Sequence, residues 1–178
     1  MNQLADTSDV VTVRRVVAAG AALGIGMGGF VDGILFHQLL QTHSMLSAKV
    51  PRDNVVGLEV NMFWDGLFHA LTWTVTAVGI ALLWRAAARG RRFPALGTFA
   101  GPLLLGWGAF NLVEGVIDHH LLGVHHVIEN ADHLVPDLAF LASGVILGVV
   151  GWLILRPTLS GERRSEGVMS AAQTHPRA

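Results

Sequence analysis

The run LVPDLAFLASGVILGVVGWLIL, residues 134–155, decides the fold, because it carries one charged side chain, that of Asp137. A bilayer core about 30 Å thick requires about 20 mostly apolar helical residues, and this run supplies them. Three other runs meet the same condition, at residues 16–40, 62–84 and 95–122. The sequence therefore predicts an all-α integral membrane protein, a bundle of four transmembrane helices.

The composition supports a membrane domain and excludes several classes of protein. The 178 residues have a mean hydropathy of +0.51 and are 14% charged, whereas soluble domains are about 25% charged. A net charge of −1 gives no basic face for nucleic acid. The absence of cysteine excludes disulfides and thiolate metal sites. We expect a polar N-terminal segment at 1–12, a transmembrane domain at 13–156 and a disordered tail at 157–178.

The positions of the arginines predict the orientation. The connection at 119–133 contains neither lysine nor arginine, and the connection at 41–61 contains only Lys49 and Arg52. By the positive-inside rule, both termini and the second connection lie in the cytoplasm. The first and third connections, which have few or no lysines and arginines, lie outside. The remaining arginines are Arg14, Arg15, Arg85, Arg89, Arg91, Arg92, Arg156, Arg163, Arg164 and Arg177.

An internal repeat relates the first and third helices. The segment DGILFHQLLQTHSML starts at Asp32 and aligns without gaps with EGVIDHHLLGVHHVI, which starts at Glu114. The alignment pairs His37 with His119 and His43 with His125. In the partner helices, Asp65 and His69 align with His133 and Asp137, in swapped order. We therefore expect two parallel helix hairpins related by a pseudo-twofold axis along the membrane normal, as in other repeat-built membrane proteins. The alternative is chance similarity.

Ionisable side chains inside the predicted spans are the candidates for function, because such groups are costly in a membrane and usually face the bundle interior. At about 1.5 Å per residue they form two layers, about 5 Å and about 11 Å below the outer boundary. Imidazole and carboxylate together suit Zn²⁺, Fe²⁺ or Mn²⁺, and imidazole also suits Cu²⁺. The predicted metal ligands are Asp32, His37, Asp65, His69, Glu114, Asp118, His119, His133 and Asp137.

Helical spacing supports only part of this site. Asp65 and His69 are four residues apart and share a helix face, whereas His37 lies about 140° around an α-helix from Asp32. Asp32 and His43 share a face only if the helix continues for three turns. Four histidines of the outer connections form a candidate lip that recruits metal: His43, His120, His125 and His126. The alternative to a metal site is a buried network of ion pairs and hydrogen bonds.

Three segments carry a family resemblance: GGFVDGILFHQLLQTHSML, NMFWDGLFHALTW and FNLVEGVIDHHLLGVHHV. They resemble the signature of a bacterial family of predicted four-helix membrane proteins, catalogued as a domain of unknown function. The resemblance covers residues 16–155 and implies a multi-pass protein of the bacterial cytoplasmic (inner) membrane, with no settled activity. It also implies the importance of Asp32, His37, Asp65, His69, Glu114, Asp118, His119, His120, His125, His126 and His133. The chain is also similar to copper-related assembly factors of cytochrome oxidase.

Three functions remain open from the sequence. The first is a membrane metalloprotein with an outward-facing mono- or dinuclear site of Zn, Fe or Cu, and a redox or hydrolytic activity on a lipid-like or small-molecule substrate. The second is a non-enzymatic copper or haem carrier that serves a respiratory-complex partner, with haem b held between His37 and His119. The third is a cation or proton conductor. The inner halves of the helices lack comparable polar residues, which disfavours conduction.

Overall fold

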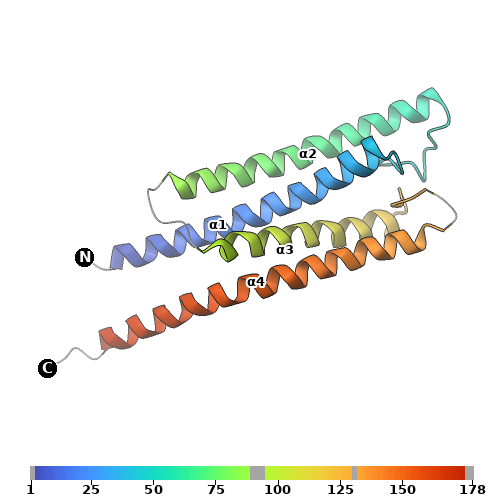
Figure 1. Ribbon diagram of the computed structural model, residues 1–178. Helices are drawn as coiled ribbons and strands as arrows, with labels where there is room; N and C mark the ends of the chain where they lie inside the picture. Colours follow the sequence, from blue (N-terminus) through green and yellow to red (C-terminus); the bar gives the residue numbers. More distant parts are fainter. Residues whose placement is uncertain (1–2, 89–94, 130–131, 175–178) are drawn as a thin grey trace.

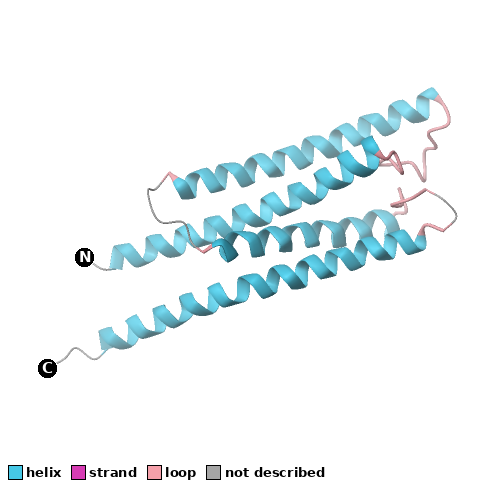
Figure 2. Cartoon of the chain, in the orientation of Figure 1, coloured by secondary structure: helices cyan, strands magenta, loops and turns pink. Residues whose placement is uncertain are grey.

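The computed structural model describes residues 3–88, 95–129 and 132–174. The chain runs through α1 (Gln3–Phe30), η1 (Val31–Leu39), α2 (Val55–Ala87), α3 (Leu96–Glu114), η2 (Gly115–Leu121) and α4 (Leu134–Thr174). The segments η1 and η2 are π-helical and continue α1 and α3. The described chain is helical apart from its connections (Figure 2). The predicted all-α fold with four long helices is confirmed.

The four long helices lie side by side in the order α2, α1, α3, α4 (Figure 1). Small residues allow the backbones of neighbouring helices to approach closely. A Cβ atom added at Gly20 of α1 would lie 2.7 Å from the carbonyl oxygen of Phe99 in α3. One added at Gly101 of α3 would lie 2.8 Å from the carbonyl oxygen of Gly151 in α4. α1 and α3 therefore form the centre of the bundle, and α2 and α4 flank it.

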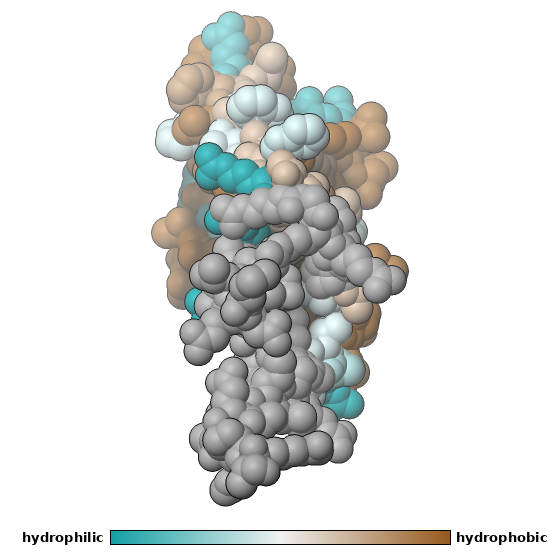
Figure 3. Space-filling view, turned by 90° about the vertical axis from the view of Figure 1, so that its left-hand side faces the viewer, coloured by the Kyte–Doolittle hydropathy of each residue, from teal (hydrophilic) through white to brown (hydrophobic). Residues whose placement is uncertain are grey.

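The flanking helices expose large apolar side chains, among them Leu71, Trp73 and Ile80 of α2 and Val145 and Val149 of α4. A view from the end that holds the termini shows hydrophobic residues around the sides of the bundle (Figure 3). Exposing such apolar faces to water is unfavourable, whereas exposing them to the hydrocarbon chains of a membrane is not. Four stretches are long and apolar enough to cross a membrane: Val13–Leu39, Val55–Ala87, Leu96–Leu121 and Leu134–Thr158. The chain is a multi-pass integral membrane protein, as predicted.

Three helices extend beyond the predicted spans. α1 begins at Gln3, within the segment predicted to be a polar N-terminal segment. α2 begins at Val55 because the side chain of Asn54 accepts a hydrogen bond from the Gly57 amide at 3.0 Å, which caps the helix. α4 continues to Thr174, through a segment for which the sequence predicted no regular structure. Hydropathy marks the part of a helix that sits in lipid, whereas capping and backbone hydrogen bonds determine where the helix ends.

The connection between η1 and α2 and the connection between η2 and α4 lie at one end of the bundle, and the two chain termini lie at the other (Figure 1). The connections hold each other: the Ala48 amide donates to the Val124 carbonyl at 3.0 Å, and the Ser47 hydroxyl donates to Glu129 Oε1 at 2.7 Å. Most of the largest fully buried side chains near this end are polar. Some of the arginines used to predict the orientation, Arg89, Arg91, Arg92 and Arg177, lie outside the described residues.

Candidate metal centre

The π-helical ends of the two central helices bring together residues that an α-helix would separate. In η1 the Leu40 amide donates to the Leu35 carbonyl at 2.8 Å, five residues back along the chain. In a π-helix, side chains five residues apart are therefore one turn apart, and His37 Nε2 lies 2.9 Å from Asp32 Oδ2. The predicted 140° offset between these side chains assumed an α-helix, and it does not hold here.

Each central helix ends in a sharp reversal that folds a histidine back over the helix end. Gln41 and Gly123 follow η1 and η2 and have φ angles of 54° and 53°. This left-handed conformation is the natural place for glycine. After the reversals His43 and His125 point inward, and both are 0% exposed. They reach the bundle from the connections, without the extended helices that the sequence argument required.

Hydrogen bonds to main-chain carbonyls fix the orientation of these two histidines. His43 Nδ1 donates to the Val127 carbonyl at 3.0 Å, and His125 Nδ1 donates to the Met45 carbonyl at 3.1 Å. The two rings stack with centroids 4.8 Å apart and an angle of 1° between planes. In the neutral state, each ring therefore presents the lone pair of Nε2 to the interior of the bundle.

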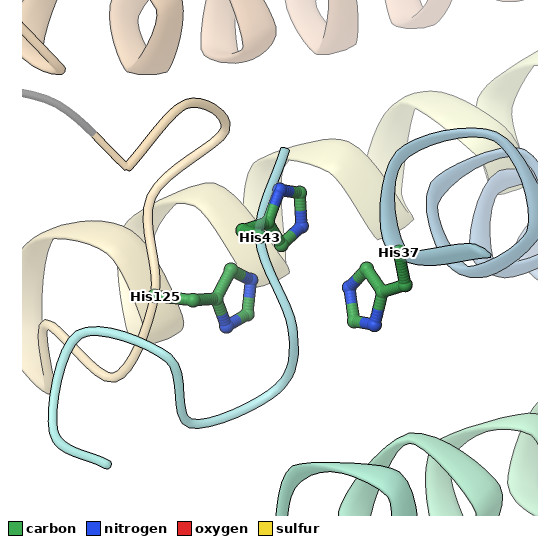
Figure 4. A group of neighbouring side chains, drawn as sticks. All are labelled: His37, His43 and His125. Carbon is green, nitrogen blue, oxygen red and sulfur yellow. The ribbon is translucent and has the colours of Figure 1, made fainter. Parts of the chain in front are cut away.

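Six side chains converge at this position, and we call them the central cluster: Asp32, His37, His43, Glu114, His119 and His125. Figure 4 shows the rings of His37, His43 and His125 converging from η1 and from the two connections. One ligand atom from each of these three histidines lies within 4.8 Å of the others. The same holds for Glu114, His119 and His125. The two groups share His125, so the donor set fits one metal ion or two.

The two carboxylates of the central cluster are buried among imidazole rings. Asp32 is 1% exposed and Glu114 is 4% exposed. His37 Nε2 lies 2.9 Å from Asp32 Oδ2, whereas neither oxygen of Glu114 has a hydrogen-bond partner in the part of the chain that the structure describes. Their nearest neighbours include imidazole nitrogens: His43 Nε2 lies 3.5 Å from Asp32 Oδ1, and His125 Nε2 lies 3.4 Å from Glu114 Oε1. Burying an ionised carboxylate is strongly unfavourable without a compensating charge.

The protonation state of His125 shows that this histidine does not supply the compensating charge. Burial, together with the nearby imidazoles of His43 and His119, lowers the pKa of His125 from 6.5 to about 3. A neutral His125 whose Nδ1–H donates to a carbonyl has a lone pair on Nε2, and that lone pair faces a carboxylate. A cation between the two groups would compensate both. The donor set therefore fits a metal ion that binds nitrogen and oxygen.

Two further carboxylates support the histidines of the central helices from outside the cluster. Asp65 Oδ1 lies 2.9 Å from His37 Nδ1 and accepts a hydrogen bond from the Met45 amide at 2.8 Å. Asp137 Oδ1 lies 3.4 Å from His119 Nδ1 and accepts from the Val127 amide at 3.0 Å. Metal-bound histidines typically have their second ring nitrogen held by a carboxylate or a carbonyl in this way.

A second group of three residues, which we call the outer cluster, consists of His126, His133 and Asp137. One ligand atom from each lies within 4.8 Å of the others. His126 Nδ1 lies 2.8 Å from Asp137 Oδ2, and its side chain is 18% exposed. The ring centroids of His126 and His133 are 3.8 Å apart. This cluster is more accessible than the central one.

Four predicted site residues lie outside both clusters: Asp65, which supports His37, and three others. His69 Nδ1 donates to the Asp65 carbonyl, one turn back along α2, at 2.7 Å. His120 is exposed, and its Nδ1 donates to the Gly115 carbonyl at 2.8 Å. Asp118 is half-buried. Conversely, His43 and His125, predicted as parts of an outer lip, lie within the central cluster.

The sequence argument missed two aromatic neighbours of the cluster. Phe68 of α2 stacks on His37 with ring centroids 5.7 Å apart, and Phe140 of α4 packs on His119 at 5.3 Å. Asp65 precedes Phe68 by three residues, as Asp137 precedes Phe140. This shared spacing of aspartate and phenylalanine was the sequence pattern from which the two aromatic neighbours could have been predicted. It aligns Asp65 with Asp137, whereas the predicted alignment matched Asp65 with His133.

Comparison with known proteins places the chain among membrane proteins. A family model described as "Predicted membrane protein (DUF2243)" matches residues 19–158, a range that includes both clusters. No curated protein and no solved structure matches the chain.

Proposed function

Since the chain belongs to this family of predicted membrane proteins, we propose a function from its geometry: it is a membrane metalloprotein whose central cluster binds one or two transition-metal ions. The observation that carries the proposal is the burial of two carboxylates, Asp32 and Glu114, against histidine nitrogens that lie close enough together to hold an ion. Zn²⁺, Fe²⁺, Mn²⁺ and Cu²⁺ all accept such a mixed set of nitrogen and oxygen ligands. Four-helix bundles often hold two-metal sites of glutamate and histidine between facing helices.

Haem b fits the same residues less well. His37 and His119 would be its axial ligands, but the parallel rings of His43 and His125 occupy the cluster between the two central helices, 4.8 Å apart. The rings of His37 and His43 are also in contact, with centroids 4.5 Å apart. A porphyrin also gives no role to two buried carboxylates. The donor set therefore favours a bare ion.

A cavity next to Asp32 supports an enzymatic function over a purely carrier function. It has a volume of about 550 Å³, within the usual range for small-molecule sites. Its lining comes from α1, η1, α3, α4 and, at Val127, the connection before α4. It is mostly apolar, with Asn111 and Ser143 as polar groups besides Asp32. Because these helices lie in the membrane, the cavity suits a lipid-soluble substrate whose polar end approaches the metal.

Metal content and an optical spectrum of the purified protein test the metal proposal. We expect zinc, iron or copper to remain bound through purification, without the Soret band that haem would give. A His43→Ala variant that is still folded should lose this metal. Protein that binds none of the three metals when they are supplied would overturn the proposal. The clusters would then form a buried polar network.

The orientation is also part of the proposal. Arginines at the end that holds the termini, such as Arg14, Arg15, Arg85 and Arg156, support a cytoplasmic position for that end of the bundle. The central cluster then faces the outer side of the bacterial cytoplasmic membrane. Reporters fused after residue 90 and at the C-terminus should read as cytoplasmic, and tags near residues 50 and 125 should be accessible from outside. Accessibility of the 85–92 connection from outside would reverse the orientation.

We further infer that the two helix hairpins are repeats related by a pseudo-twofold axis between α1 and α3. Pairs of aligned residues in the two hairpins make the same contacts, and this supports the inference. His43 donates to Val127 as His125 donates to Met45, and residues 43 and 45 align with residues 125 and 127. The left-handed residues Gln41 and Gly123 align in the same way.

A further inference from the structure

We propose that the outer cluster is a second metal site, at which divalent ions of the Zn²⁺ type bind before they enter the central cluster. His126, His133 and Asp137 supply two imidazoles and one carboxylate, with one ligand atom from each within 4.8 Å of the others. Zinc ions at sites that keep an open position are usually bound by three protein ligands and a water molecule. The binding site stands on this geometry, and its role in entry rests on the proposed function of the central cluster.

Exposure distinguishes the two clusters. The His126 side chain is 18% exposed, whereas His43 and His125 are 0% exposed. A hydrated ion cannot reach a fully buried set of ligands without losing its water. The outer cluster can exchange water ligands for imidazole nitrogens one at a time, because part of it remains in contact with solvent.

The first hairpin shows that the fold does not need histidines at these positions. Under the alignments of the two hairpins, Ser44, Asn61 and Asp65 correspond to His126, His133 and Asp137. The Ser44 hydroxyl accepts a hydrogen bond from Arg52 at 3.2 Å. The Asn61 side chain accepts from the Leu46 amide at 3.0 Å and donates to the Val50 carbonyl at 2.8 Å. These residues hold a connection in place, so the histidines of the second hairpin call for another explanation.

Asp137 connects the two clusters. Its Oδ2 atom lies 2.8 Å from His126 Nδ1 in the outer cluster, and its Oδ1 atom lies 3.4 Å from His119 Nδ1 in the central cluster. An ion bound by Asp137 is therefore one side chain away from the central ligands. No equivalent second group is found around Asp65 among the described residues. The entry path is predicted to exist on the second hairpin alone.

The test is a Zn²⁺ titration of the full-length protein in detergent after removal of metal with a chelator. The variant combines His126→Ser and His133→Asn, the residues that the first hairpin has at these positions, which keeps the connection compatible with the fold. We expect wild type to bind Zn²⁺ in a tight and a weaker step. The double variant should lose the weaker step, keep the tight one and load it more slowly.

The matched control is His120→Ala, which removes an exposed histidine of the same connection and should change neither step. His43→Ala should abolish the tight step and leave the weaker one. A double variant with the affinities, stoichiometry and loading rate of wild type would overturn the proposed outer site. Loss of the weaker step without slower loading would overturn its role in entry. If wild type shows only the weaker step and the double variant loses it, the outer site stands and the proposed central site fails.

Discussion

The hairpin of α1 and α2 and the hairpin of α3 and α4 agree at the centre of the molecule and differ at its edges. Both have a π-helical end, a left-handed reversal and a histidine that folds back onto a buried carboxylate. Both also have an aspartate and a phenylalanine next to the histidine of the central helix. The shared contacts all concern the central cluster, which indicates that the two hairpins build one site together.

The differences lie on the side of the second hairpin. Histidines replace Ser44 and Asn61, and a cavity opens next to Asp32. On the side of Glu114, Phe110 occupies the position that aligns with Gly28, and it packs against Phe68 with ring centroids 6.1 Å apart. Under the proposed function, both hairpins supply ligands, whereas ions and substrate approach from the side of α4.

The largest expected effect tests whether the two hairpins are equivalent at the centre. His43→Ala and His125→Ala should each abolish metal retention, because each removes a ligand from a buried set that water cannot easily replace. The measurement is metal content after gel filtration, with a thermal unfolding profile to verify the fold. His120→Ala is the matched control and should keep its metal. Full retention by a folded His125→Ala variant and loss by His43→Ala would contradict the equivalence.

A smaller effect is expected from the supporting carboxylates. Asp65→Asn and Asp137→Asn should each weaken metal affinity by roughly 10- to 100-fold, since each loosens the orientation of a ligand histidine without removing it. Competition with a chelator of known affinity measures this change. Asp137→Asn should also weaken the outer site, so its zinc titration should change in both steps. Equal titration curves for the two variants would argue against the sharing of Asp137 between clusters.

The sequence predicted the membrane fold well, because hydropathy and length depend on composition alone. It also identified every member of the central cluster as a candidate ligand or lip residue. It could not predict which of them meet. The contact between Asp32 and His37 depends on five-residue hydrogen bonding in η1, and helical periodicity assumes an α-helix. The inward position of His125 depends on a chain reversal at Gly123, a tertiary feature that periodicity does not report.

The smallest expected effect concerns the stability of the metal-free protein. The pKa of His125 is about 3 in the folded state, compared with an ordinary value of 6.5. Between these two values the unfolded chain binds a proton that the folded chain does not, so stability falls as the pH decreases from about 6.5 toward 3. Each pH unit in this window costs on the order of 1 kcal/mol. Above pH 6.5 this contribution to stability is fully present.

Thermal unfolding of chelator-treated protein between pH 7 and pH 4 measures this dependence, and His125→Gln isolates it. Glutamine cannot be protonated in this range, so the variant should lose stability less steeply with acid than wild type does. His120→Gln is the control, because that exposed residue lies outside both clusters and should leave the slope unchanged. Identical slopes for wild type and His125→Gln would mean that His125 is not held neutral by burial. The lone pair facing Glu114, on which the central cluster depends, would then lose its support.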